Sequence, residues 1–127
     1  MSPLSELLDQ LADTIKDGCG IEVSLRELPA SGGIYAELSA GYPDAQYYDK
    51  TAIRIIPVLF LAKYRSQKEC MDSLSAICAY LHKLHPYPQG ETFAWLDATT
   101  ATEPNKIGRQ EDGRYIYSCI INCKIFY

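Results

Sequence analysis

The strongest apolar run in the sequence is Ile53-Arg54-Ile55-Ile56-Pro57-Val58-Leu59-Phe60-Leu61-Ala62. Branched aliphatic and aromatic side chains favour strands, so the run predicts one long strand over residues 53–62. Pro57 has no backbone N–H to donate to a neighbouring strand, and we therefore expect a bulge, a break or a sheet edge at this position. The other elements should assemble around this strand.

A helix is expected soon after the strand. The segment Ser66-Gln67-Lys68-Glu69 matches a capping box, in which the serine oxygen and the glutamate satisfy each other's backbone donors. Pro86 ends the helix, because proline cannot continue it. One face of this helix is apolar and carries Cys70, Leu74, Ile77, Cys78, Leu81 and Leu84.

The chain also starts with a predicted helix. Pro3 suits the first helical turn, and Gly18 with Gly20 suits the helix end. The apolar residues between them fall on one stripe, which is typical of an amphipathic helix packed on a core. They are Leu4, Leu7, Leu8, Leu11 and Ile15.

The remaining segments predict strands and connections. Residues 21–28 alternate apolar and polar side chains, and the turn at 29–33 makes residues 34–38 the expected hairpin partner. Residues 41–50 are polar and rich in turn residues. We expect a strand at 91–98, a long polar segment at 99–113 and a final strand at 114–127.

These elements follow the order helix, three strands, helix, two strands. Short connections between strands permit hairpins rather than crossovers, which favours an antiparallel sheet. We therefore predict an α+β fold: a mostly antiparallel sheet of about four to five strands with two helices packed on one face. A chain of 127 residues has the usual size of one domain, so residues 1–127 are expected to form a single domain.

Charge and hydropathy narrow the range of partners. The formal net charge is −4, so the chain lacks the surplus of Lys and Arg that nucleic acids and anionic membranes attract. No apolar stretch approaches the length that spans a bilayer, and the N-terminus lacks the layout of a signal peptide. We expect no membrane association, no direct nucleic-acid recognition and a cytosolic location.

The five cysteines form no CxxC pair, and most lie in apolar periodic runs, which is typical of reduced core thiols. Cys78, His82 and His85 have the spacing of one helical stripe and are acceptable zinc ligands in kind. Cys78 also belongs to the apolar face, and no fourth ligand is spaced nearby. We expect no metal and no cofactor here, and zinc content in the purified protein would test this.

Enzyme motifs are incomplete. Gly33-Ile34-Tyr35 with Tyr115-Ile116-Tyr117 has only a superficial likeness to the GIY-YIG nuclease signatures, and Pro43-Asp44 lacks the acidic-x-Lys triplet of another nuclease class. A GxSxG nucleophile elbow and a GxxxxGK[ST] phosphate loop are both absent. We therefore expect no catalytic residues, with a small metal-dependent nuclease or hydrolase as the rival class.

Two segments are candidates for contact with other proteins. Tyr42, Tyr47 and Tyr48 fall where little core burial is available, and tyrosine is favoured at protein interfaces. Residues 103–114 mix both charge signs with Gly108 and Gly113, as expected either of a functional arm or of a solvated hairpin closed by Asp112-Gly113. Both interpretations of the second segment stay open.

The chain resembles bacteriophage minor capsid proteins found in phages and prophages of Gram-positive bacteria. The resemblance covers nearly the whole length and rests on four stretches: Glu37-Leu38 through Gly41-Tyr42, Lys50 to Lys63, Gln67 to Leu74, and Ile107 to Ser118. Proteins of this kind resemble the tail terminators of long-tailed phages, whose helix, antiparallel sheet, helix arrangement agrees with the predicted order.

The resemblance implies a homohexameric ring at the head-tail junction that caps the tail tube. The implied partners are further copies of the chain, the tail-tube protein and a head-tail connector protein. The implied location is the virion, with the host cytoplasm during assembly. The expected subunit or tube contacts are Tyr42, Asp44, Tyr47, Arg109, Gln110, Glu111, Asp112 and Arg114. Another head-tail connector protein is the alternative within the same class.

Overall fold

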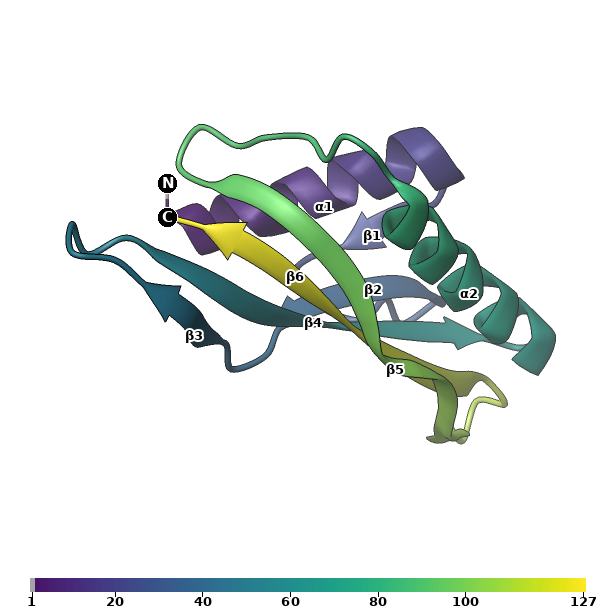
Figure 1. Cartoon of the computed structure of the whole chain (residues 1–127). Helices are drawn as coiled ribbons and strands as arrows, with labels where there is room; N and C mark the ends of the chain where they lie inside the picture. Colours follow the sequence, from purple (N-terminus) through teal and green to yellow (C-terminus); the bar gives the residue numbers. More distant parts are fainter. Residues whose placement is uncertain (1) are drawn as a thin grey trace.

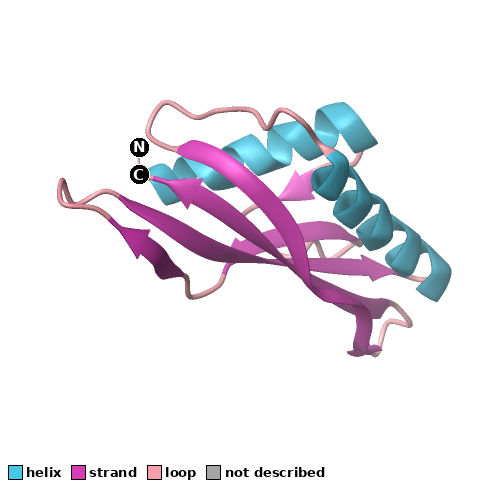
Figure 2. Cartoon of the chain, in the orientation of Figure 1, coloured by secondary structure: helices cyan, strands magenta, loops and turns pink. Residues whose placement is uncertain are grey.

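The computed structural model describes residues 2–127, which form two helices and a six-stranded sheet (Figures 1 and 2). The elements in chain order are α1 (Pro3–Cys19), β1 (Val23–Ser24), β2 (Gly33–Leu38), β3 (Tyr42–Gln46), β4 (Ala52–Tyr64), α2 (Gln67–Lys83), β5 (Ala94–Arg109) and β6 (Tyr115–Phe126). The predicted α+β class is confirmed.

Both helices begin at a capping serine. The Ser2 hydroxyl accepts a hydrogen bond from the Ser5 N–H at 3.2 Å, and the Ser66 hydroxyl accepts one from the Glu69 N–H at 3.3 Å. These bonds satisfy backbone donors that the first helical turn leaves without partners. α1 ends at Gly20, whose φ of 69° suits a residue without a Cβ.

The long strand β4 lies in the middle of the sheet, whose order is β1-β2-β4-β6-β5. β4 pairs antiparallel with β6 along its length, from Ile53 opposite Phe126 to Tyr64 opposite Tyr115. On its other side β4 pairs with β2 and then with β3. Every strand pair is antiparallel except β1 with β2.

The core lies between the helices and one face of the sheet. Alternate residues of β4 and β6 point into it, together with the apolar stripes of α1 and α2 and the Trp95 side chain of β5. The β4 members are Ala52, Ile56, Val58, Phe60 and Ala62, and the β6 members are Tyr117, Cys119, Ile121, Cys123 and Ile125. Both helices therefore cover the same face, as predicted.

The predicted hairpin between residues 21–28 and 34–38 is wrong. Only Val23–Ser24 forms a strand, and it runs parallel to β2 with Val23 opposite Ile34. The Ser24 hydroxyl donates a hydrogen bond to the Glu27 carbonyl at 2.9 Å. This local bond bends the chain away from the sheet, because a serine hydroxyl competes with ladder pairing.

Residues 41–50 were not expected to form a strand, yet Tyr42–Gln46 pairs with the start of β4. β4 has no bulge or break at Pro57, because it continues through Pro57 opposite Asn122 of β6. The third predicted alternative, an edge, fits the other side of β4, where Pro57 has no ladder partner. The change occurs in the neighbour: β2 ends opposite Val58, and the Ser39 N–H donates to the Pro57 carbonyl at 2.8 Å. The donor that proline lacks therefore falls where one partner strand gives way to the next.

The long polar segment predicted at residues 99–113 is wrong for most of its length, because β5 extends to Arg109. The pairing with β6 shifts register four times, beginning between Trp95 and Asp97. Such bulges disturb the period-two pattern by which a strand is recognised in sequence. Most side chains beyond Thr99 are exposed whichever way they point, so polar residues are compatible with the strand.

Glu6 ties the start of α1 to the connection between α2 and β5. Its carboxylate accepts hydrogen bonds from the Glu91 N–H at 2.9 Å, the Thr92 N–H at 2.8 Å and the Thr92 hydroxyl at 2.6 Å. The Thr92 hydroxyl and the two backbone donors lower the pKa of Glu6 below its usual value of 4.5. The ionised carboxylate is therefore the form that stabilises the fold.

Replacing Glu6 should weaken the fold in a pH-dependent way. A lowered folded-state pKa means that the contribution of Glu6 is complete above its unfolded value of 4.5 and disappears as the pH falls through the folded value. We expect Glu6→Gln to lower the urea midpoint near neutral pH and to match the wild-type protein in acid. Asp9→Asn, at an exposed position of the same helix, is the control. A difference that stays constant with pH would contradict this role.

Candidate assembly surfaces

One face of the sheet carries apolar side chains that no described helix covers. Between Ile53 and Leu61, the β4 residues that alternate with the core residues are apolar: Ile53, Ile55, Pro57, Leu59 and Leu61. The next residue on this side, Lys63, is charged. Register places Ile116, Ile120 and Phe126 of β6 and Tyr35 of β2 on the same side. We call these nine apolar residues the open face. They are half-buried rather than buried.

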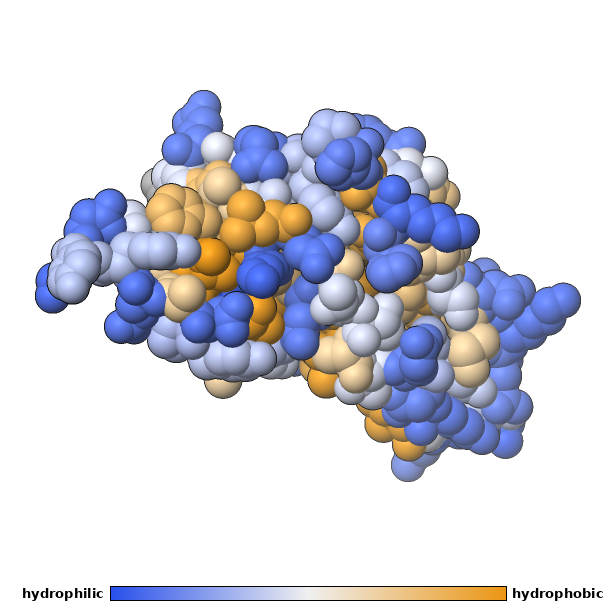
Figure 3. Space-filling model, viewed as in Figure 1, coloured by the Kyte–Doolittle hydropathy of each residue, from blue (hydrophilic) through white to orange (hydrophobic). Residues whose placement is uncertain are grey.

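Figure 3 shows apolar side chains gathered beside the β3–β4 hairpin, over the adjoining ends of β4, β6 and β5. Lys124 and Asp97 are opposite each other on the same side of the sheet, so the apolar area has a charged border. A contiguous apolar surface with a polar border is typical of a site that contacts another protein.

The structure brings Tyr42, Asp44 and Tyr47 together on the β3–β4 hairpin. Tyr42 and Tyr47 are 55% and 50% exposed, as expected for contact residues. Tyr47 also contacts Phe126 edge to face, with ring centroids 6.0 Å apart. The Asp44 carboxylate lies 3.7 Å from the Lys124 ammonium, so it has an intramolecular partner.

Residues 110–114 form the turn of the β5–β6 hairpin. Of the two interpretations of this segment, a functional arm or a hairpin closed by Asp112-Gly113, the structure shows the hairpin. The Gly113 N–H donates to the Gln110 carbonyl at 3.0 Å, and Gly113 has a φ of 87°. Asp112 accepts hydrogen bonds from the Arg114 N–H at 3.0 Å and from its guanidinium at 2.8 Å, and these lower the pKa of Asp112. Asp112 and Arg114 therefore hold the turn itself.

Other side chains of the β5–β6 hairpin are free for contact. Glu111 is exposed, and Ile107 is a large apolar side chain with 59% exposure. Arg109 and Lys106 lie over the Tyr115 ring, at 5.6 Å and 5.0 Å from its centroid. Cation–π contacts at exposed sites are weak enough to exchange for intermolecular ones.

The two hairpins lie at opposite ends of the sheet. The β3–β4 turn precedes Ala52 and the β5–β6 turn lies beside Tyr64, so the length of β4 separates them (Figure 1). At about 3.3 Å per strand residue this separation is roughly 40 Å. The predicted contact residues therefore form two sites rather than one.

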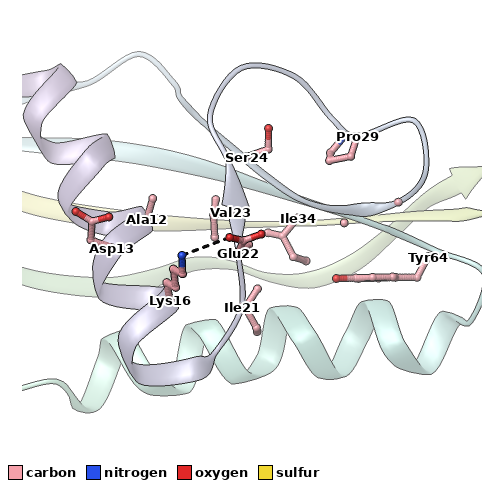
Figure 4. Close-up of a pocket in the computed structure, with 12 residues that line it drawn as sticks. Ala12, Asp13, Lys16, Ile21, Glu22, Val23, Ser24, Pro29, Ile34 and Tyr64 are labelled. Atoms are coloured by element: carbon pink, nitrogen blue, oxygen red, sulfur yellow. Dashed lines mark ion pairs between the residues drawn. The ribbon is translucent and has the colours of Figure 1, made fainter.

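A pocket of about 620 Å³ opens between α1, β1 and the start of β2 (Figure 4). Apolar side chains that line it come from the α1–β1 connection and from β1, β2 and β4: Ile21, Val23, Ile34 and Tyr64. Polar groups also line it, and the Lys16 ammonium lies 3.4 Å from the Glu22 carboxylate. The pocket can accept a group that is apolar on one part and polar on another.

The spacing of Cys78, His82 and His85 does not form a cluster in the structure. Cys78 is buried, with its sulfur 3.7 Å from that of Cys119, whereas His82 and His85 are exposed and α2 ends at Lys83 before the second histidine. Residues 2–127 contain no group of three His, Cys, Asp or Glu side chains placed to hold a metal ion. Within the same residues, neither helix combines the length and apolar character needed to cross a membrane.

The fold is similar to that of a chain in the solved structure of the virion of a native gene transfer agent particle. The TM-score is 0.58, with 9% sequence identity over 99% of this chain and 96% of the other. No protein-family model matches the sequence, and no curated protein matches it. At 9% identity the likeness concerns the fold, and it extends over both chains almost from end to end.

The open face and the pocket were not predicted from the sequence. The signal for the open face was present, because the run at residues 53–62 is apolar at both odd and even positions. A run that is apolar on both sides indicates burial on both sides, as in a sheet covered on two faces. The chain itself covers one face and leaves the other half-buried.

Proposed function

We propose that this chain is a structural protein of a phage-like virion, a tail terminator that forms a ring at the head-tail junction and caps the tail tube. The observation that carries the proposal is the end-to-end likeness in fold to a chain of a gene transfer agent virion. The sequence resemblance to phage minor capsid proteins supports the same class independently. The protein would be located in the virion, after assembly in the host cytoplasm.

The surfaces of the monomer support a role in assembly. The open face offers apolar area, and the two hairpins offer exposed tyrosines at one end and unpaired charges at the other. The two ends are different surfaces, so contact between them is head to tail, and head-to-tail contacts form a ring when the rotation between neighbours closes. Tyr42, Asp44, Tyr47 and the Arg109 to Arg114 turn are proposed to contact neighbouring copies or the tube.

A ring of six, with the tail-tube protein and a head-tail connector as its neighbours, is the proposed assembly. A connector protein that adapts the portal is the alternative in the same class. Light scattering across a concentration series tests the proposal, because a terminator should convert from monomer to one closed species of fixed mass. A mass that grows continuously would indicate open polymers and contradict a closed ring.

The contribution of the β5–β6 turn can be tested without unfolding it. Arg109→Ala combined with Glu111→Ala removes exposed charges and keeps Asp112, which holds the turn. We expect the concentration of half-assembly to rise about tenfold, equivalent to about 1.4 kcal/mol. Lys83→Ala, an exposed charge at the end of α2, is the control. Equal assembly by both variants would remove this turn from the interface.

A further inference from the structure

The tip of the β3–β4 hairpin carries one aromatic side chain that is not packed against the rest of the chain. Tyr48 is fully exposed, at 107% of the reference area, whereas its neighbour Tyr47 packs against Phe126. Exposing a tyrosine ring to water is unfavourable, and buried tyrosines are frequent anchors at protein interfaces. Tyr48 is therefore placed to act as an anchor for a partner outside its own chain.

The backbone that carries Tyr48 is already ordered. The Asp49 carboxylate accepts hydrogen bonds from the Thr51 N–H at 3.1 Å and the Thr51 hydroxyl at 2.6 Å. The Lys50 N–H donates to the Tyr47 carbonyl at 3.1 Å, with Lys50 at a φ of 73°. A tip held in this way loses little conformational entropy on binding, which favours its use as an anchor.

The pocket between α1 and β1 has the chemistry of a tyrosine receptor. Its apolar lining suits an aromatic ring, and the carboxylates and the ammonium that also line it can bond a hydroxyl (Figure 4). Asp13 lines the pocket and makes no ion pair among the described residues, and neither does Lys50 at the tip. Seating Tyr48 in the pocket would bring this free cation and this free anion together.

The tip and the pocket lie too far apart to meet within one chain. The tip precedes Ala52, and the pocket is lined by Tyr64 at the other end of β4. The twelve-residue rise between these positions is roughly 40 Å. The occupant must therefore come from another molecule, and a second copy of this chain supplies a tip at the end opposite its own pocket.

We propose that Tyr48 of one copy inserts into the α1–β1 pocket of the next, and that this contact, repeated head to tail, builds the ring. The inference rests on the proposed function and adds the two sites that join neighbouring subunits. Each copy then gives one tip and receives one, so every tip and every pocket in a closed ring is occupied.

Two variants test the Tyr48 anchor and the α1–β1 pocket separately. Tyr48→Ala removes the anchor and keeps the pocket, whereas Ala12→Trp fills the pocket and keeps the anchor, because Ala12 lies on the α1 wall. Each variant alone is expected to be monomeric at concentrations where the wild-type protein forms rings. Tyr48→Phe keeps the aromatic group and should assemble like the wild-type protein. Asp13→Lys replaces an exposed residue and gives a second pocket variant should Ala12→Trp fail to fold.

Mixing the variants gives the sharpest result. An equimolar mixture of Tyr48→Ala and Ala12→Trp can form one intact contact, so light scattering should show heterodimers and nothing larger. A mixture that stays monomeric, or that forms rings, would overturn the pairing. Unchanged rings with Tyr48→Ala would overturn it while leaving the proposed function standing, whereas a wild-type protein that never assembles would overturn both.

Discussion

Phe60→Ala is expected to lower the free energy of unfolding by about 3–5 kcal/mol, the range for removing a buried phenylalanine ring. Phe60 is completely buried at the centre of β4, opposite Ala36 on one side and Cys119 on the other. The neighbouring strands hold the backbone in place, so the site cannot collapse around an alanine. Urea denaturation followed by circular dichroism measures the loss.

The matched control is the next residue. Leu59 belongs to the open face and is half-buried, so Leu59→Ala removes fewer contacts and should cost less than half as much. Both residues lie on β4 between the same two strands, β2 and β6, and they differ in the face of the sheet to which they belong. Equal losses of unfolding free energy at the two positions would show that the second face is packed within the monomer. This result would contradict the assignment of Leu59 to an uncovered face.

Leu59→Lys should weaken ring formation strongly while leaving the monomer folded. The lysine lies opposite Glu37 of β2, and an opposite-charge pair across two strands offsets part of the lost apolar contact. A lysine placed in an apolar interface leaves a charge without water, which costs about 2 kcal/mol or more and corresponds to about a thirtyfold rise in the half-assembly concentration. Light scattering measures this rise.

Met71→Lys is the control for the open face. Met71 is an exposed apolar residue on α2, away from the sheet, and a lysine there should leave assembly unchanged. Wild-type behaviour of Leu59→Lys would exclude the open face from the ring contacts. Circular dichroism and thermal denaturation of both variants separate an assembly defect from unfolding.

The helices and the two central strands could be predicted because each has a strong local signal. Ser66 and the apolar stripe define α2, Gly20 ends α1, and the run at residues 53–62 lies within β4. These signals depend on residues close in sequence, so tertiary packing reinforces them. The pairing of the edge strands has no comparable signal.

The missed strands depend on distant partners. Tyr42–Gln46 becomes a strand only because β2 ends and leaves the start of β4 free to pair. The outer part of β5 pairs with β6 although its side chains are polar, because hydrogen bonds to a neighbouring backbone do not require apolar side chains. β1 is too short to be recognised by alternation.

The candidate contact residues remain a prediction, and the structure shows only where they lie. Composition singled out the two segments that carry these residues but predicted no hairpin at residues 41–50, and the structure shows that Tyr42 and Tyr47 are exposed. Sequence could not place the two hairpins at opposite ends of β4, because this depends on which strands pair. The α1–β1 pocket combines residues from four elements, such as Lys16 and Tyr64, and no spacing in the sequence indicates it.

Negative-stain images of the concentrated wild-type protein test the central claim most directly. A ring-forming virion protein predicts closed particles with one central opening and a cyclic symmetry, with six subunits expected. The particle images should be classified without imposed symmetry, so that the number of subunits is observed and not assumed. Uniform closed rings would support a head-to-tail terminator, whereas twofold dimers, open filaments or monomers at every concentration would contradict it.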